Sequence, residues 1–205
     1  MRNEIERGLA ALGLAAPADA IGRLARYLEL IERWNRVYNL TAITDPAEMV
    51  PKHLLDSLAA LPRLEGAKLA DVGSGAGLPG IPIAIMRPAL PVVLVESSGK
   101  KARFLRTAQR ELGLANVTVA ETRIERWRPD AAPEAVIARA LAPLPELCAL
   151  VRPWLPPGGR LYALKGPKAE QELGALPPGF ELERSHRLEV PGLDAERWLH
   201  VLRRT

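Results

Sequence analysis

The sequence predicts an α/β protein with a largely parallel sheet and helices on both faces, preceded by a helical N-terminal extension. Two observations predict this fold. Residues 1–62 carry no strand signal, whereas from residue 67 short apolar runs alternate with helical segments. Such alternation is typical of βαβ units with right-handed crossovers. We therefore expect an N-terminal helical part over residues 1–62, packed on a main domain over residues 63–205.

The N-terminal part is expected to form three helices. A short amphipathic helix is placed over residues 5–12. A longer helix ending near Tyr38 is predicted by apolar residues at helical spacing, namely Leu24, Leu28, Ile31 and Trp34. Asp45 and Pro46 give a third helix a capping carboxylate followed by proline in its first turn, and this helix should run to about Pro62.

In the main domain, strands and helices are expected to alternate. The expected strands are residues 68–72, 91–96, 116–120, 134–138 and 159–164. The expected helices are residues 78–87, 99–112 and 143–151. Residues 180–190 and 198–202 alternate in hydrophobicity and predict a closing antiparallel pair.

The composition excludes several classes of protein. Cys148 is the only cysteine, so intrachain disulfides and cysteine-cluster metal sites are excluded. The longest apolar stretch, residues 78–95, contains Arg87 and several prolines and is not a membrane span. A net charge of +4 favours a polyanionic partner, and 4% aromatic residues argue against a stacking platform for RNA. We expect a cytoplasmic monomer without a metal.

A glycine-rich turn, residues 71–80 with the sequence DVGSGAGLPG, lies between an expected strand and an expected helix. Glycines there let the backbone approach a ligand, and the helix start offers free N–H groups. Gly75-x-Gly77-x-x-Gly80 satisfies the dinucleotide fingerprint, with Glu96 ending the next strand. The turn begins earlier, at Gly73, and an acidic residue followed by three alternate glycines is the pattern of S-adenosylmethionine (SAM) sites.

SAM is favoured over NAD because Pro79 and Pro82 lack N–H donors that a pyrophosphate needs. Glu96 would accept the ribose hydroxyl groups of either cofactor. Asp71 would order the turn or meet the cationic end of SAM. The sequence thus predicts a Rossmann-like, SAM-dependent methyltransferase sheet, with an NAD-dependent oxidoreductase as the alternative.

The sequence lacks the motifs that are typical of two kinds of base methylation. Methylation at base C5 usually needs a Pro-Cys nucleophile, and Cys148 follows a leucine inside an expected helix. Exocyclic amines usually need an Asn/Asp-Pro-Pro-aromatic motif after the fourth strand, where this chain reads Ala138–Leu141. A ring nitrogen with a free lone pair, which needs no general base, fits best. No catalytic residue is expected, and Arg139, which ends an apolar strand, is the nearest to one.

The helix expected at residues 99–112 has an apolar face and a basic face. Between residues 98 and 128 there are eight basic residues against three acidic ones, a local surplus of +5. This concentration favours contacts with nucleic-acid phosphates. Lys165 occupies, after the following strand, the position that matches Arg139.

Taken together, these features resemble the bacterial 16S rRNA guanine-N7 methyltransferase G family, also called glucose-inhibited division protein B. The resemblance covers nearly the whole chain. It is carried by Trp34-Asn35, Tyr38–Thr41, His53, Leu55–Ser57, Asp71–Pro82, Glu96–Lys100, Arg103–Arg106, Arg123–Glu125, Arg139-Ala140 and Ala163–Gly166.

The resemblance implies SAM-dependent methylation of guanine N7 at one site in the decoding-region loop of 16S rRNA, either naked or in a small-subunit particle. A non-catalytic RNA-binding module with a relict SAM pocket is a further alternative. The expected cofactor residues are Asp71, Gly73, Ser74, Gly75, Gly77, Leu78, Glu96, Ser97, Arg123, Ile124, Glu125 and Arg139. The expected RNA-binding residues are Asn39, His53, Lys100, Arg103, Arg106 and Lys165.

Overall fold

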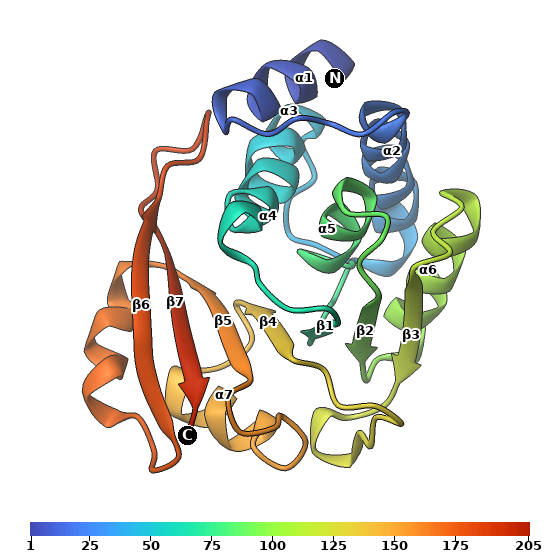
Figure 1. The fold of residues 1–205 in the computed structure, drawn as a ribbon. Helices are drawn as coiled ribbons and strands as arrows, with labels where there is room; N and C mark the ends of the chain where they lie inside the picture. The colour runs from blue at the N-terminus through green and yellow to red at the C-terminus, as the bar shows by residue number, and fades with distance from the viewer.

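The computed structural model describes residues 1–205 and has one seven-stranded sheet at its centre (Figure 1). The strands are β1 (Leu69–Val72), β2 (Val92–Glu96), β3 (Val117–Glu121), β4 (Ala135–Arg139), β5 (Arg160–Lys165), β6 (Phe180–Leu188) and β7 (Arg197–Arg204). Their order is β3-β2-β1-β4-β5-β7-β6. The first five are parallel, and β7 runs antiparallel between β5 and β6. The expected parallel sheet and its closing antiparallel pair are therefore confirmed.

This topology separates the chain from the dinucleotide-binding fold. That fold has the strand order 3-2-1-4-5-6 in an open, mostly parallel sheet. Here an antiparallel strand, β7, is inserted between β5 and β6. Both folds share the crevice outside the carboxyl ends of the central strands, because strand order reverses beside β1 in each.

Helices cover both faces of the sheet. The α-helices are α1 (Arg2–Ala11), α2 (Ala20–Tyr38), α3 (Pro46–Met49), α4 (Asp56–Leu58), α5 (Gly80–Met86), α6 (Gly99–Glu111) and α7 (Leu144–Val151). A π-helix, η1 (Val50–Leu55), joins α3 to α4. The 3-10 segments are η2 (Leu61–Arg63), η3 (Ile124–Arg126) and η4 (Pro167–Ala175). None of the helices combines the length and apolar character that crossing a bilayer requires.

The third N-terminal helix is present where it was expected and runs without a break from Pro46 to Leu58, but its middle, residues 50–55, is a π-helix, which the sequence pattern did not predict. The capping carboxylate is in place, since the Asp45 side chain accepts the Ala47 N–H at 2.9 Å. The change of hydrogen-bond pattern is placed at Pro51, which has no N–H for the regular α-helical ladder. The chain widens to a π-helix there, and the Asp56 N–H reaches back to the Pro51 carbonyl.

The N-terminal helices share one hydrophobic core with one face of the sheet. This core of 41 buried residues runs from Ile5 in α1 through Leu28 in α2 to Phe104 in α6 and Tyr162 in β5. A second core of 16 residues lies under the opposite face, where Leu147 in α7 takes part. A domain boundary after residue 62 stays a prediction, because nothing in the packing separates the two sides.

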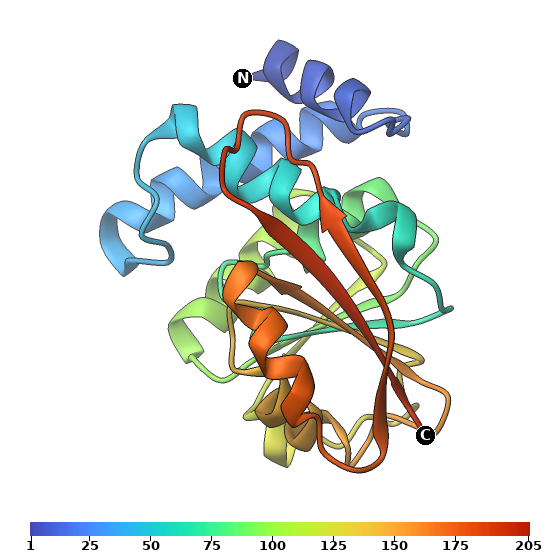
Figure 2. The same cartoon turned by 90° about the vertical axis from the view of Figure 1, so that its left-hand side faces the viewer.

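Figure 2 shows that the turn joining β6 to β7 extends from the sheet toward α1. Gly192 in this turn lies beside Pro51 of the π-helix. The C-terminal hairpin and the N-terminal helices therefore meet, although they are at opposite ends of the chain.

Candidate active site

The glycine-rich turn leaves β1 in a conformation that needs glycine. Gly73, Gly75 and Gly77 have φ angles of 68°, 59° and 89°, in the left-handed region that other residues rarely adopt. A Cβ on Gly73 would lie 2.6 Å from a methyl carbon of Leu141. The Gly75 N–H donates to Glu96 at 2.8 Å, which ties the turn to the end of β2.

Asp71 stabilises the glycine-rich turn by a hydrogen bond to its last residue, Gly80. Its side chain is fully buried, and one carboxylate oxygen accepts the Gly80 N–H at 2.8 Å while the other has no partner. Burial raises the pKa of this carboxyl to about 7. Asp71 and Gly77 line neither of the two pockets described below, so their contact with a cofactor stays a prediction.

A pocket of about 400 Å³ lies outside the carboxyl ends of β1, β2 and β3, and we call it the β2-side pocket. Seven of the expected cofactor residues line it, namely Gly73, Glu96, Ser97, Arg123, Ile124, Glu125 and Arg139. The buried Glu96 carboxylate also accepts the Ser98 N–H at 2.7 Å. Each of its oxygens retains a lone pair, so a pair of ribose hydroxyl groups can still donate to it.

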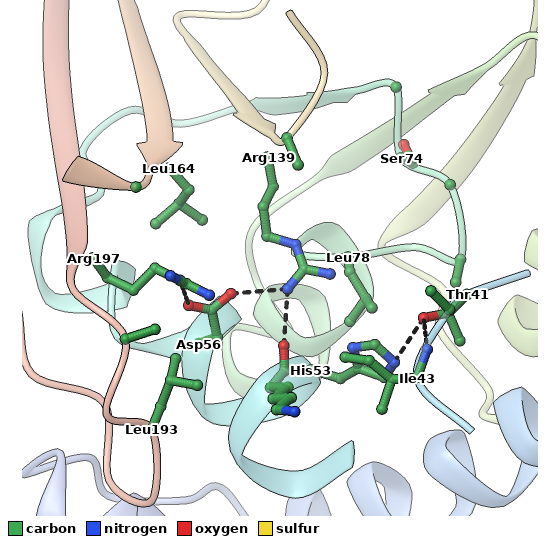
Figure 3. A pocket seen from close by; sticks show the side chains of 18 of the residues that line it. Thr41, Ile43, His53, Asp56, Ser74, Leu78, Arg139, Leu164, Leu193 and Arg197 are labelled. Atoms are coloured by element: carbon green, nitrogen blue, oxygen red, sulfur yellow. Dashed lines mark hydrogen bonds and ion pairs between the residues drawn. The ribbon is translucent and has the colours of Figure 1, made fainter. Parts of the chain in front are cut away.

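A second pocket, of about 640 Å³, lies on the other side of Gly73, and we call it the β5-side pocket (Figure 3). Gly73, Arg139 and Ala140 line both pockets, so the two meet there. The expected cofactor residues Ser74, Gly75 and Leu78 and the expected RNA residues His53 and Lys165 line the β5-side pocket. Its charged lining has four cations, Lys52, Arg139, Lys165 and Arg197, and one carboxylate, Asp56.

Arg139 lies at the junction of the pockets, and only one nitrogen of its guanidinium is hydrogen-bonded within the protein. Nη1 donates to the Lys52 carbonyl at 3.1 Å and to Asp56 at 2.9 Å. Nε and Nη2 make no hydrogen bond within the protein. Figure 3 shows Arg139 reaching between Asp56 on one side and Leu78 on the other. A free Nε–Nη2 edge is the fork that carboxylates and phosphates bind in bidentate fashion.

The loop after α2 is fixed by the asparagine of the Trp34-Asn35 motif. The Asn35 side chain accepts the Thr41 N–H at 2.9 Å and donates to the Thr41 carbonyl at 3.0 Å. The Thr41 hydroxyl in turn lies 3.2 Å from Nε2 of His53. Burial and the nearby Arg139 lower the pKa of His53 to about 4. His53 is therefore a neutral group at physiological pH.

The remaining expected RNA residues line neither pocket. Lys100, Arg103 and Arg106 are exposed on α6, beside the β3 edge of the sheet (Figure 1). Arg106 is paired with Glu121 at 2.7 Å, whereas Arg103 has no ion-pair partner. Asn39 is exposed just after α2. Contact of any of these residues with RNA stays a prediction.

Sequence reasoning missed three charged residues of the β5-side pocket as site residues, Lys52, Asp56 and Arg197. Asp56 lay within a motif that carried the family resemblance, and that was the only signal for it. Arg197 sits in a stretch without a motif. Cys148 is buried in α7, where burial raises the pKa of its thiol to about 12, and it is not a nucleophile. No group of three or more His, Cys, Asp or Glu residues is placed to hold a metal.

Comparison with known proteins agrees with this geometry. The family model described as GidB, rRNA small subunit methyltransferase G, matches residues 20–200. The chain belongs to this family. A ribosomal RNA small subunit methyltransferase G from Xanthomonas axonopodis pv. citri is 52% identical over 98% of this chain and 93% of its own. The protein of the same name from Aromatoleum aromaticum is 50% identical, over 98% and 97%.

Solved structures show the same fold. TrmN from Thermus thermophilus matches with a TM-score of 0.57 and 25% identity, over 74% of this chain and 48% of its own. TYW2 from P. horikoshii in complex with MeSAdo matches with a TM-score of 0.53 and 11% identity, over 67% and 56%. The protein is a SAM-dependent methyltransferase. The alternative of an NAD-dependent oxidoreductase is set aside, as the inserted antiparallel strand already indicated.

Proposed function

We propose that this protein transfers the methyl group of SAM to N7 of one guanosine in the decoding-region loop of 16S ribosomal RNA. The observation that carries the proposal is the pair of pockets that meet at Gly73, Arg139 and Ala140. One has room for a nucleoside donor and the other for an acceptor base. The names of the curated relatives support the small-subunit RNA as substrate. We further propose that the protein acts as a monomer in the cytoplasm.

On the donor side, the chain's residues fit SAM. Glu96 and Ser97 would hold the ribose, and Ile124 and Glu125 would flank the adenine. The free edge of Arg139 would hold the carboxylate of the amino-acid end. Gly73 has no side chain where the cofactor crosses from one pocket to the other, and a Cβ there would already crowd Leu141. When bound, SAM supplies a methyl group that its sulfonium has already activated.

On the acceptor side, the β5-side pocket suits a neutral base with flanking phosphates. Guanine N7 has a lone pair and no proton, so its methylation needs no general base. Leu40, Ile43 and Leu78 would pack on the ring, and Lys52 and Arg197 would attract phosphates. Positive charge passes to the base during transfer, and a neutral His53 does not oppose it. Catalysis would then consist mainly of positioning, worth roughly 7 kcal/mol or more.

The basic face of α6 would guide the RNA to this pocket. Lys100, Arg103 and Arg106 lie on one exposed helix face, and only Arg106 is held by an ion pair. Contacts of this kind position a nucleic acid without reading its sequence.

The test is transfer of radiolabelled methyl from SAM to small-subunit particles and to naked 16S RNA from cells lacking this protein. We expect label in one guanine, recovered as 7-methylguanine, and the two substrates separate particle from free RNA. Label at another atom would overturn the N7 assignment. SAM binding without transfer to either substrate would support the relict RNA-binding module instead.

A further inference from the structure

Asp56 joins two arginines that lie far apart in the sequence. Oδ2 accepts from Nη1 of Arg139 at 2.9 Å, and Oδ1 accepts from Nε of Arg197 at 2.8 Å. The Asp56 side chain is 7% exposed, whereas those of Arg139 and Arg197 are 20% and 29% exposed. Two partly exposed cations therefore converge on a nearly buried carboxylate (Figure 3).

The π-helix and the first residue of α4 present two acceptors to the same nitrogen. The Lys52 carbonyl and the Asp56 carboxylate, four residues apart, both accept from Nη1 of Arg139. One end of the guanidinium is thereby fixed, and the Nε–Nη2 edge is left free. An arginine side chain has many rotamers, so fixing it before a ligand arrives lowers the entropy cost of binding.

The charge of the trio still suits an anion. Two guanidinium groups and one carboxylate leave a net charge of +1 beside Gly73. Arg197 also gives Asp56 the second partner that a nearly buried carboxylate needs. The arrangement therefore orients Arg139 without neutralising its attraction for an anionic ligand.

We propose that Asp56 is a positioning residue that holds Arg139 with its free edge ready for the carboxylate of the cofactor, and that Arg197 keeps Asp56 in place. Asp56 itself does not touch the cofactor. This inference rests on the proposed function, since it assigns the free edge of Arg139 to the amino-acid end of SAM.

The test compares two ligands that differ at that end. S-adenosylhomocysteine carries the amino-acid carboxylate, and 5′-methylthioadenosine has the same adenosine and sulfur without it. We expect Asp56→Asn to weaken binding of S-adenosylhomocysteine by roughly tenfold, the loss of one charge-assisted hydrogen bond, and that of 5′-methylthioadenosine by less than about twofold. Equal losses for both ligands, or no loss for either, would overturn the proposal.

A double-mutant cycle separates positioning from a structural role. In an Arg139→Gln background, Asp56→Asn should cost no further affinity for S-adenosylhomocysteine, because the group that it positions is gone. The same loss in both backgrounds would show that Asp56 acts through the fold and would overturn the inference. If Asp56→Asn fails to fold, Arg197→Gln serves in its place, with the same ligand preference and a smaller loss.

Glu183→Gln is the matched control. Glu183 pairs with Arg160 at 2.8 Å, is also partly buried, and lies outside both pockets. Removing this ion pair should leave both dissociation constants unchanged. Failure of the wild type to bind S-adenosylhomocysteine would refute the proposed function itself. Tight wild-type binding that Asp56→Asn leaves unaltered would refute only the positioning role.

Discussion

The two pockets that meet at Gly73 are built in different ways. The β2-side pocket is formed mainly by residues at or just after the carboxyl ends of β1, β2, β3 and β4, four neighbouring parallel strands, with a few residues from α6 and α7. The β5-side pocket collects segments from most of the chain, including residues 40–43, 52–56, 164–166 and 193–197. The first needs only the order of the strands. The second needs the N-terminal helices and the C-terminal hairpin to be docked on the sheet.

This difference shows how one small protein can combine a general half with a specific one. The carboxyl ends of adjacent parallel strands always meet at one edge, so a nucleoside site arises there wherever the turns are suitable. The β5-side pocket, which we propose takes the acceptor base, depends in addition on segments outside the five parallel strands. We expect substrate specificity to lie mainly in those segments, and the following variants test how far the two halves can be separated.

The largest effect is expected for Arg139→Ala, because Arg139 lines both pockets. It removes the free fork and leaves the nearly buried Asp56 with one partner, so kcat/KM should fall by about 100-fold or more. Steady-state methyl transfer measures kcat/KM, and calorimetry with SAM measures the affinity for the cofactor separately. Arg139→Lys keeps the charge and loses the fork, and should recover little. Loss of RNA binding with unchanged SAM affinity would assign Arg139 to the acceptor half alone.

Gly73→Ala should disturb both pockets, because Gly73 lines both and the substitution adds a methyl group there. The positive φ costs about 1 kcal/mol, and the new Cβ would lie 2.6 Å from Leu141 at the junction of the pockets. We expect SAM affinity to fall by at least roughly tenfold. Gly13→Ala is the matched control, since its φ of 67° is nearly the same and nothing lies within 4 Å of its Cβ. Equal effects of both substitutions would show that backbone strain alone is responsible.

Asp71→Asn should change how the free energy of unfolding depends on pH, because it removes the buried carboxyl group beneath the glycine-rich turn. The folded-state pKa of about 7 is raised above the unfolded value, so the folded protein binds the proton more tightly. The contribution of Asp71 to stability is therefore present below about pH 4 and is lost as pH rises through 7. At about 1.36 kcal/mol per pKa unit, its upper limit is roughly 4 kcal/mol.

Urea unfolding of the wild type and of Asp71→Asn between pH 5 and 8 measures this linkage. The stability of the variant relative to the wild type should improve as pH rises. A difference that stays constant with pH would show that Asp71 titrates well below this range.

Arg103→Glu on α6 should affect only the RNA side. Arg103 has no ion-pair partner, so its reversal disturbs no internal contact. The slope of log affinity against log salt should become shallower by about 1, while SAM affinity stays unchanged. Arg152→Glu, an exposed arginine after α7 on the opposite face, is the control. If both variants behave alike, overall charge and not the α6 face attracts the RNA.

The smallest effect is expected from pH on the methyl-transfer step. His53 has a pKa of about 4, so it stays neutral from pH 6 to 9, and the rate should show no limb near neutrality that depends on it. Single-turnover rates of the wild type and of His53→Gln over this range test the expectation. A limb near pH 7 that disappears in the variant would make His53 a general base. A limb that disappears only in Asp71→Asn would trace to the buried carboxylate.

The β2-side half could largely be foreseen from the sequence because its signals are local. The glycine turn, Glu96 at the end of a strand and Arg139 at the end of another are each visible within ten residues of chain. Asp71 was expected to order the turn or to meet the cofactor; its carboxylate accepts the Gly80 N–H at the start of α5, which fits the first role, and contact with the cofactor stays a prediction.

The β5-side half could be foreseen only in part: His53, Lys165 and the residues of the glycine turn were expected, but the ion pairs around Asp56 were not, because their partners are remote in the sequence. Asp56 and Arg197 are 141 residues apart, and no spacing rule joins them. The π-helix was also missed, because the pattern over residues 45–62 is compatible with a regular helix until Pro51 is considered together with its tertiary neighbours.

The sequence by itself determined the strands, the glycine turn, the basic face of α6 and the family, since these depend on local periodicity and on short motifs. Only the tertiary structure decided that Lys52, Asp56 and Arg197 surround Arg139. The physical reason is that Arg139, Asp56 and Arg197 are brought together when the N-terminal helices and β7 pack onto one core. No local sequence pattern indicates which remote residues such packing will bring into contact.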